Sequence, residues 1–244
     1  MNYIRFSILL LAMLAGSISF AQVLPPAPGP APEVKMVEPQ RFELPNGLKI
    51  ILVENHKLPT VVYSLYVNYD PIVEGDKAGV LSAMGSLLEK GTTKRDEEAF
   101  AKAVDLIGAN FGTNPRGGFM QGLSKHRNEM GKLMAEAILQ PAFPQTAFER
   151  EVKQQISGLA IQKESPEAIA NQVSGALMYG KDHPYGEFAT EETWGNIKVE
   201  DCRKYYDTYF KPNNAYLVMV GDLNMVQAKE IAQNNFGSWQ KGET

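Results

Sequence analysis

The sequence has little of the two residue types that build most metal and redox sites in proteins. Its 244 residues include one cysteine, Cys202, and three histidines, His56, His126 and His183. A single cysteine excludes an intrachain disulfide framework and every cysteine-rich zinc module. The histidines lie too far apart in the sequence to predict a metal site built from them. We interpret Cys202 as a small buried apolar group.

The sequence also has no excess of basic residues. Lys and Arg together number 24 against 28 Asp and Glu, so the formal net charge is −4. Such a chain lacks the basic surface that binds a nucleic-acid backbone, which excludes nucleic acid as an expected partner. No GxGxxG or GxxxxGK[ST] motif supports nucleotide binding. The apolar fraction of 44% is enough to build a sizeable core.

The first 21 residues read MNYIRFSILLLAMLAGSISFA. The positive residue Arg5 precedes an apolar stretch, and Ser19-Phe20-Ala21 places small residues before a cut at Gln22. This pattern predicts a secretory signal peptide at 1–21 and an exported protein, periplasmic if the source is Gram-negative. An uncleaved anchor is the alternative, although the apolar stretch is short for a membrane span of about 20 residues. No later segment is long and apolar enough to span a membrane, so we expect none after cleavage.

The remaining chain divides into a linker and one folded domain. Residues 22–40 are rich in proline, which predicts an extended spacer. We expect the folded domain at 41–240.

Turn residues and hydrophobic periodicity predict the elements of this domain. Asn46-Gly47 supplies the positive φ of a tight turn, which indicates a hairpin over 41–54. Gly91 marks the end of one helix, and Ser165-Pro166 the start of another. After the hairpin we expect a strand at 60–69, helices at 77–90 and 96–107, strands at 110–114 and 118–123, helices at 126–139, 145–163, 165–179 and 198–210, a strand at 214–220 and a helix at 224–236. This order favours an α+β fold with two layers, in which helices cover one face of a mostly antiparallel sheet.

Six segments in this order carry a resemblance to a known family. They are LPNGLKIILVENHKLPTVVYSLYV, the helix ending in EKGT, LIGANFGT, QPAFPQTAFEREV, SPEAIANQVSGALMYGKDHPYGE and YFKPNNAYLVMVGDL. Together they resemble the M16 zinc peptidases, which include pitrilysin, insulin-degrading enzyme and the mitochondrial processing peptidase. The resemblance covers about residues 40–240, which is one half-domain. M16 chains usually carry two such halves, and the second is absent from these 244 residues, so the chain is either a fragment or a single half.

Active members of that family carry HxxEH on the helix before the KGT turn. Two histidines at i and i+4 share a helical face and bind zinc, and the glutamate between them polarises water. A further glutamate on a later helix completes the three ligands. Alignment on Gly91-Thr92 places the motif on Ser82, Gly85 and Ser86, and the distal glutamate falls near Ser157 or Gly158. Hydroxyls are poor zinc ligands and glycine has no side chain, so the resemblance implies that the metal and the catalytic residues are lost.

The resemblance implies three possible functions. The first is a noncatalytic subunit that forms a heterodimer with an HxxEH-bearing M16 chain and helps to enclose extended peptides. The second is an independent periplasmic module that binds peptides or acts as a scaffold. The third is an active zinc peptidase with unrecognised ligands, but no HxxEH or inverted equivalent occurs in the sequence.

The family binds extended peptides by adding them as a strand to an exposed sheet edge, where main-chain hydrogen bonds hold them. The matching segment is Asn110–Asn114, and the resemblance implies that Phe111, Gly112 and Thr113 contact the peptide. Edge pairing uses the backbone, so it does not depend on the lost catalytic side chains. A purely structural strand is the alternative interpretation.

Overall fold

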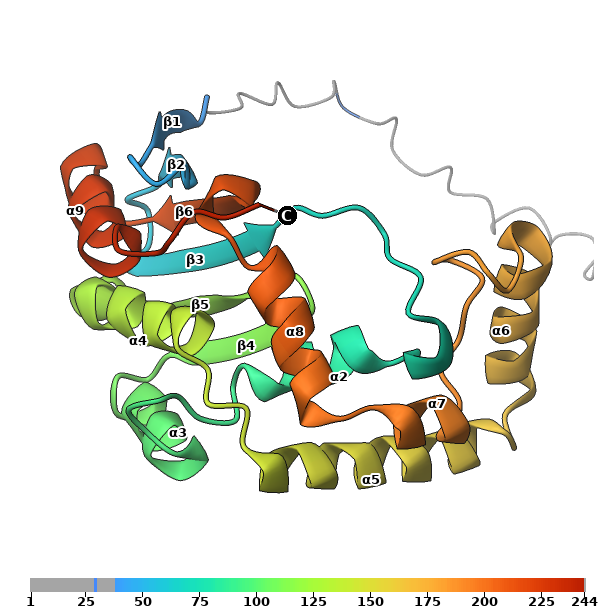
Figure 1. The fold of residues 1–244 in the computed structure, drawn as a ribbon. Coiled ribbons are helices and arrows are strands. Elements are labelled where there is room, and N and C mark those ends of the chain that lie inside the picture. Colours follow the sequence, from blue (N-terminus) through green and yellow to red (C-terminus); the bar gives the residue numbers. More distant parts are fainter. Residues whose placement is uncertain (1–28, 30–37, 244) are drawn as a thin grey trace, which may run out of the picture. The chain divides into compact units, whose positions relative to one another are not determined.

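The computed structural model describes Gly29 and residues 38–243 (Figure 1). The predicted signal peptide and most of the predicted linker lie outside the described residues. The compact unit begins at Glu38. Within the described part of the chain, no helix combines the length and the apolar character that crossing a membrane would require.

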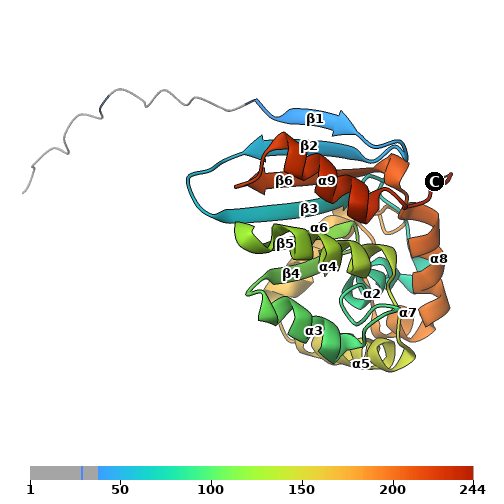
Figure 2. The same ribbon diagram turned by 90° about the vertical axis from the view of Figure 1, so that its left-hand side faces the viewer.

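The centre of this unit is a six-stranded sheet in the order β1-β2-β6-β3-β5-β4 (Figure 2). Its strands are β1 (Gln40–Glu43), β2 (Lys49–Glu54), β3 (Thr60–Val67), β4 (Asn110–Asn114), β5 (Gly117–Leu123) and β6 (Ala215–Gly221). Every neighbouring pair is antiparallel except β2 and β6, which run parallel. The prediction of a mostly antiparallel sheet in an α+β fold is therefore confirmed.

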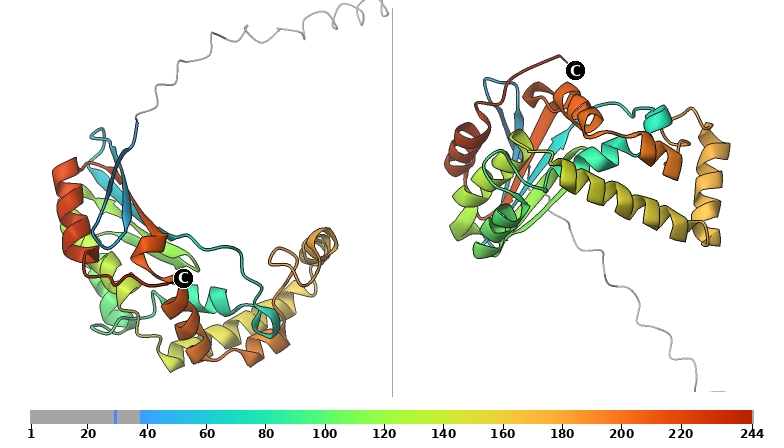
Figure 3. Two further views of the ribbon diagram at one scale, coloured as in Figure 1. Left: turned by 45° about the horizontal axis from the view of Figure 1, so that its top comes forward. Right: turned by 60° about the horizontal axis from the view of Figure 1, so that its bottom comes forward.

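Eight α-helices accompany the sheet in the described residues. They are α2 (Val80–Leu87), α3 (Glu97–Leu106), α4 (Arg127–Leu139), α5 (Gln145–Gln162), α6 (Pro166–Tyr179), α7 (Glu191–Asn196), α8 (Val199–Tyr209) and α9 (Met225–Phe236). Helices α4 and α9 lie across one face of the sheet, as Figure 2 shows. Helix α2 packs against α8, α5 and the edge strand β4. Helix α5 leads away from the sheet toward α6 (Figure 3).

Alternation of buried and open residues along the strands explains why one face is covered. On β3, Tyr63 and Leu65 are almost fully buried, whereas Tyr66 on the opposite face is 43% exposed. The covered face meets α4 residues such as Met130 and Leu133, which have no exposed surface. Side chains alternate between the faces of a strand, so this pattern places the core between the sheet and the α4–α9 layer.

The turn between β1 and β2 forms as the sequence predicts. Gly47 has a φ of +85°, and its N–H donates to the Leu44 carbonyl at 2.8 Å. The preceding Asn46 is buried, and its side-chain amide donates to the Phe236 carbonyl at 2.8 Å. The hairpin is thus fastened to the end of α9, which is far away in the sequence.

The structure differs from the prediction at two places. The helix expected at 77–90 is a short 3-10 turn at Gly75–Lys77 followed by α2, because Gly79 has a φ of +110° and interrupts the helix. Helix α7 was not predicted; it begins with a capping box in which Thr190 and Thr193 bond reciprocally. Cys202 is fully buried as predicted, and this burial raises the pKa of its thiol to about 12.

Candidate functional site

Helix α2 carries the three positions that align with HxxEH, and a carboxylate fixes where this helix begins. Gly79 at the N-cap offers no capping side chain. Glu74 takes that role, because its Oε2 accepts hydrogen bonds from the N–H groups of Gly79 at 3.0 Å and Leu81 at 2.9 Å. Burial raises the pKa of Glu74, and these N–H groups oppose the rise because they favour the charged form. The start of α2 is therefore held in one register.

The three aligned positions have different surroundings. Ser82 is exposed, and Ser86 is partly buried with its hydroxyl donating to Glu151 Oε1 at 3.2 Å. Gly85 is buried, and its carbonyl accepts a hydrogen bond from the Thr113 hydroxyl at 2.8 Å. Helix α2 therefore contacts α5 through Ser86 and the edge strand through Gly85.

The α5 residues that face α2 are not those predicted for the distal glutamate. The Ser157 hydroxyl donates to the Lys153 carbonyl of its own helix at 2.8 Å, and a Cβ added to Gly158 would have no neighbour within 4 Å. Glu151 instead lies opposite Ser86, and Gln155 donates to the same Glu151 oxygen at 2.9 Å. Sequence reasoning missed Glu151, although it is a carboxylate on the correct helix.

The residues at this corner do not fit the zinc ion of the M16 peptidases. Zinc sites of the catalytic type use three ligands from histidine, cysteine, aspartate or glutamate. Here Glu151 is accompanied by the Ser86 hydroxyl and the Gln155 amide. Within residues 38–243, no group of three or more histidine, cysteine or acidic side chains is placed to bind a metal ion.

The predicted peptide-contact residues lie on β4, the outermost strand of the sheet. In the described structure, the backbone partners of β4 all belong to β5. The Phe119 ring covers Gly112, because a Cβ added to this glycine would lie 2.8 Å from it. The Phe111 ring packs edge-on against Phe100 of α3, with 5.4 Å between centroids. Phe111, Gly112 and Thr113 thus lie on a strand whose outer edge has no backbone partner among the described residues.

A cavity of about 250 Å³ adjoins the start of this strand. Phe100, Val104 and Phe111 provide its apolar lining. Charged residues of both signs line it as well, and Lys90 pairs with Glu89 at 3.0 Å and with Glu97 at 3.4 Å. A side chain of an extended segment paired with β4 would have an apolar pocket beside it.

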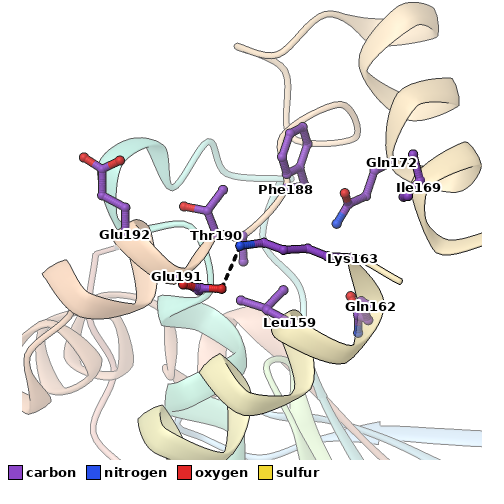
Figure 4. Close-up of a pocket in the computed structure, with 10 residues that line it drawn as sticks. Leu159, Gln162, Lys163, Ile169, Gln172, Phe188, Thr190, Glu191 and Glu192 are labelled. Atoms are coloured by element: carbon purple, nitrogen blue, oxygen red, sulfur yellow. Dashed lines mark hydrogen bonds and ion pairs between the residues drawn. The ribbon is translucent and has the colours of Figure 1, made fainter. Parts of the chain in front are cut away.

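A second cavity, of about 410 Å³, lies between the end of α5, helix α6 and residues 188–192 (Figure 4). Lys163 and Glu191 form an ion pair of 2.7 Å across it. Helix α6 contains no buried residue, and Ile169, Val173 and Leu177 of this helix are 46%, 49% and 81% exposed. These three residues recur every four positions, so α6 presents an apolar stripe outside the core.

Three comparisons with known proteins find similar sequences and structures. The sequence profile described as "Peptidase M16 inactive domain" matches residues 196–244. The non-peptidase homolog YmxG of Helicobacter pylori is 23% identical over 201 residues, which cover 80% of this chain and 46% of that protein. A crystal structure of a peptidase M16 inactive domain from Pseudomonas fluorescens superposes with a TM-score of 0.77 at 25% identity, over 85% of this chain and 52% of the other.

A structure described as a protease from Helicobacter pylori superposes with a TM-score of 0.74 at 20% identity, again over 85% of this chain and 52% of the other. This second structural likeness supports the fold alone. The chain spans about half the length of these relatives. The findings agree with the resemblance inferred from the sequence and with the expectation that the chain is not a peptidase on its own.

Proposed function

Because the chain is an M16-like protein of the noncatalytic kind, we propose that it is a binding subunit of an exported peptidase assembly. It pairs with a separate M16 chain that carries HxxEH, and it holds extended peptides as a strand added to β4. It has no zinc cofactor of its own. The observation that carries this proposal is an edge strand whose outer side has no backbone partner in the described structure, next to a helix that has Ser82, Gly85 and Ser86 at the positions aligned with HxxEH.

The edge of β4 supports peptide binding through its backbone. An outer strand presents a row of N–H and C=O groups that pair with any extended chain, and side-chain pockets then add selectivity. The cavity at Phe100, Val104 and Phe111 lies where such a pocket is needed. Its apolar lining favours a peptide that presents an apolar side chain there.

The loss of the catalytic residues supports the need for a partner. A chain that holds a peptide beside Gly85 and Ser86 has no group there to activate water, so cleavage must come from another subunit. The exposed apolar stripe of α6 is a surface that such a partner could cover. The predicted signal peptide supports export, so both subunits would act outside the cytoplasm, in the periplasm if the source is Gram-negative.

The partner is tested by affinity purification of the tagged full-length protein from its source organism, followed by mass spectrometry. We expect an HxxEH-bearing M16 protein at near-equal amount in the exported fraction. A chain that is recovered alone and is monomeric at micromolar concentration would support the second function, an independent peptide-binding module. Stoichiometric zinc with peptide hydrolysis by the isolated chain would support the third and would contradict both others.

Peptide pairing is tested with proline, which removes one backbone donor and blocks strand addition. Neighbouring residues of a strand point their N–H groups to opposite sides, so Phe111→Pro and Gly112→Pro together include one change on the outer edge. Arg41→Pro in β1, the other edge of the sheet, is the control. Fluorescence anisotropy with labelled extended peptides should show at least a tenfold loss of affinity for one β4 variant and little change for the control. If both β4 variants bind the peptides as tightly as the control, pairing at β4 is ruled out.

A further inference from the structure

The position of the HxxEH glutamate, Gly85, is filled from outside by the backbone of the turn between β4 and β5. A Cβ added to Gly85 would lie 2.5 Å from the nitrogen of Pro115 and 2.6 Å from the carbonyl carbon of Asn114. Real Cβ atoms do not approach backbone atoms so closely, and the turn cannot yield as a flexible side chain would. The space in which a catalytic side chain would stand is therefore occupied by the protein itself.

Glycine at this position is unexpected from helix propensity. It lies inside α2, where glycine destabilises a helix relative to alanine. A compensating contact is therefore required, and the close approach of Asn114 and Pro115 provides it. The Thr113 hydroxyl adds a hydrogen bond of 2.8 Å to the Gly85 carbonyl.

The turn that meets Gly85 is held rigidly from its other side. Gly117 has a φ of +137°, and a Cβ there would lie 2.2 Å from the Leu65 carbonyl oxygen. The Tyr69 hydroxyl donates to the Pro115 carbonyl at 2.9 Å. The Arg116 guanidinium lies 4.1 Å from the centre of the Tyr69 ring and donates to the Tyr69 carbonyl at 2.6 Å. These contacts fix Pro115 in the position that closes on α2.

We propose that the corner formed by α2, α5 and the β4–β5 turn is a metal-independent joint that positions the edge strand. In active relatives, the resemblance implies a zinc ion that bridges the helix carrying HxxEH and the later helix carrying the distal glutamate. In this chain, the hydrogen bond from Ser86 to Glu151 links the same two helices, and Gly85 joins α2 to β4. Gly85 is thus a positioning residue for β4, and substitution reports on the joint without any peptide or partner.

The substitution Gly85→Ala tests the joint because two effects predict opposite signs. Helix propensity alone predicts a higher Tm, whereas the clash with Pro115 predicts a lower one. Gly158→Ala is the matched control, since it lies in a helix and its Cβ would meet nothing within 4 Å. We expect a Tm at least 5 °C below wild type for Gly85→Ala and a Tm at or above wild type for the control. A rise in Tm for both variants would overturn the proposal.

Hydrogen–deuterium exchange tests whether the joint positions β4 and remains informative if Gly85→Ala does not fold. Thr113→Val keeps the shape of the side chain and removes the hydrogen bond to Gly85. Thr208→Val is the control for this variant, because the Thr208 hydroxyl donates to the Lys204 carbonyl of its own helix. We expect the β4 amides to exchange at least threefold faster in Thr113→Val than in Thr208→Val, with no change in β1. Equal exchange of β4 in the two variants would show that the joint does not hold this strand.

Zinc alone tests whether the joint is independent of metal. We measure the change in Tm that zinc chloride or EDTA causes in wild type and in Glu151→Gln. We expect this change to be the same in the two proteins. A zinc-induced rise in wild type that Glu151→Gln abolishes would show that a metal ion holds this corner, and the proposal would be wrong. Neither this test nor the two before it requires peptide binding, so their failure is distinct from failure of the proposed function.

Discussion

Removal of one buried charge tests how the loop after α2 is fixed. Glu136 on α4 has 5% of its surface exposed. Its Oε1 accepts a hydrogen bond from the Thr92 hydroxyl at 2.7 Å, and its Oε2 pairs with the guanidinium of Arg95. The Thr92 hydroxyl in turn accepts from the Arg95 N–H at 3.0 Å. One carboxylate therefore holds two points, Thr92 and Arg95, of the loop that joins α2 to α3.

The substitution Glu136→Gln keeps the size of the side chain and removes its charge. Breaking a buried ion pair from one side destabilises a protein by about 3–5 kcal/mol. The Arg95 side chain is 29% exposed and can recover hydration, so the loss of stability should be smaller than this range, at about 2–3 kcal/mol. For a domain of this size, the corresponding decrease in Tm is about 4–12 °C.

Urea unfolding followed by circular dichroism measures this free energy of unfolding directly. Glu129→Gln on the same helix is the control, because Glu129 and its partner Lys132 are exposed and 3.6 Å apart. An exposed pair of this kind should change the free energy of unfolding by less than about 0.5 kcal/mol. If Glu136→Gln and Glu129→Gln destabilise the protein equally, the network around Glu136 does not fix the loop.

Three further outcomes are expected. Leu133→Ala, at a fully buried position of α4, should lower the free energy of unfolding by about 2–5 kcal/mol in urea, whereas Leu106→Ala, at a position 76% exposed, should change it by less than about 0.5 kcal/mol. The pKa of His56 is raised by its hydrogen bond to Asp222. Protonated His56 therefore stabilises the fold below its unfolded pKa, and this contribution is lost as the pH rises through the folded pKa. His56→Asn should lower the Tm at pH 5 but not at pH 9, and an equal decrease at both would contradict this assignment. Ser165→Ala removes the N-cap of α6 and should weaken this helix by about 0.5–2 kcal/mol, which hydrogen exchange would detect as faster exchange confined to α6.

Elements whose signals are local could be predicted from the sequence. Asn46-Gly47 correctly predicts a turn and Ser165-Pro166 the start of a helix. Both signals depend only on residues close by in the sequence. The predicted start of α2 is wrong because the apolar spacing continues across Gly79, which adopts a left-handed conformation and packs closely against Trp194. Local patterns do not reveal such tertiary contacts.

The lost HxxEH positions were identifiable by alignment, but the corner that they form was not. Glu151 and Gly158 lie two turns apart on nearly the same face of α5, so which of them meets α2 depends on where along its length α5 crosses that helix, and the spacing from Ser165 does not fix this point. The contact of Gly85 with Pro115 joins a helix and a turn that are remote in the sequence, and a glycine in a helix has no pattern that signals it. Residue types could therefore be predicted, whereas their three-dimensional neighbours required the structure.

The position of β6 has a consequence for the order in which the protein is made. Residues 215–221 are translated after all the other strands, yet they lie between β2 and β3 at the middle of the sheet. Until this segment leaves the ribosome, β2 and β3 each have an unpaired side that can associate with other nascent chains. Premature termination before residue 215 should therefore yield an aggregation-prone product that requires chaperones, and not a smaller folded domain.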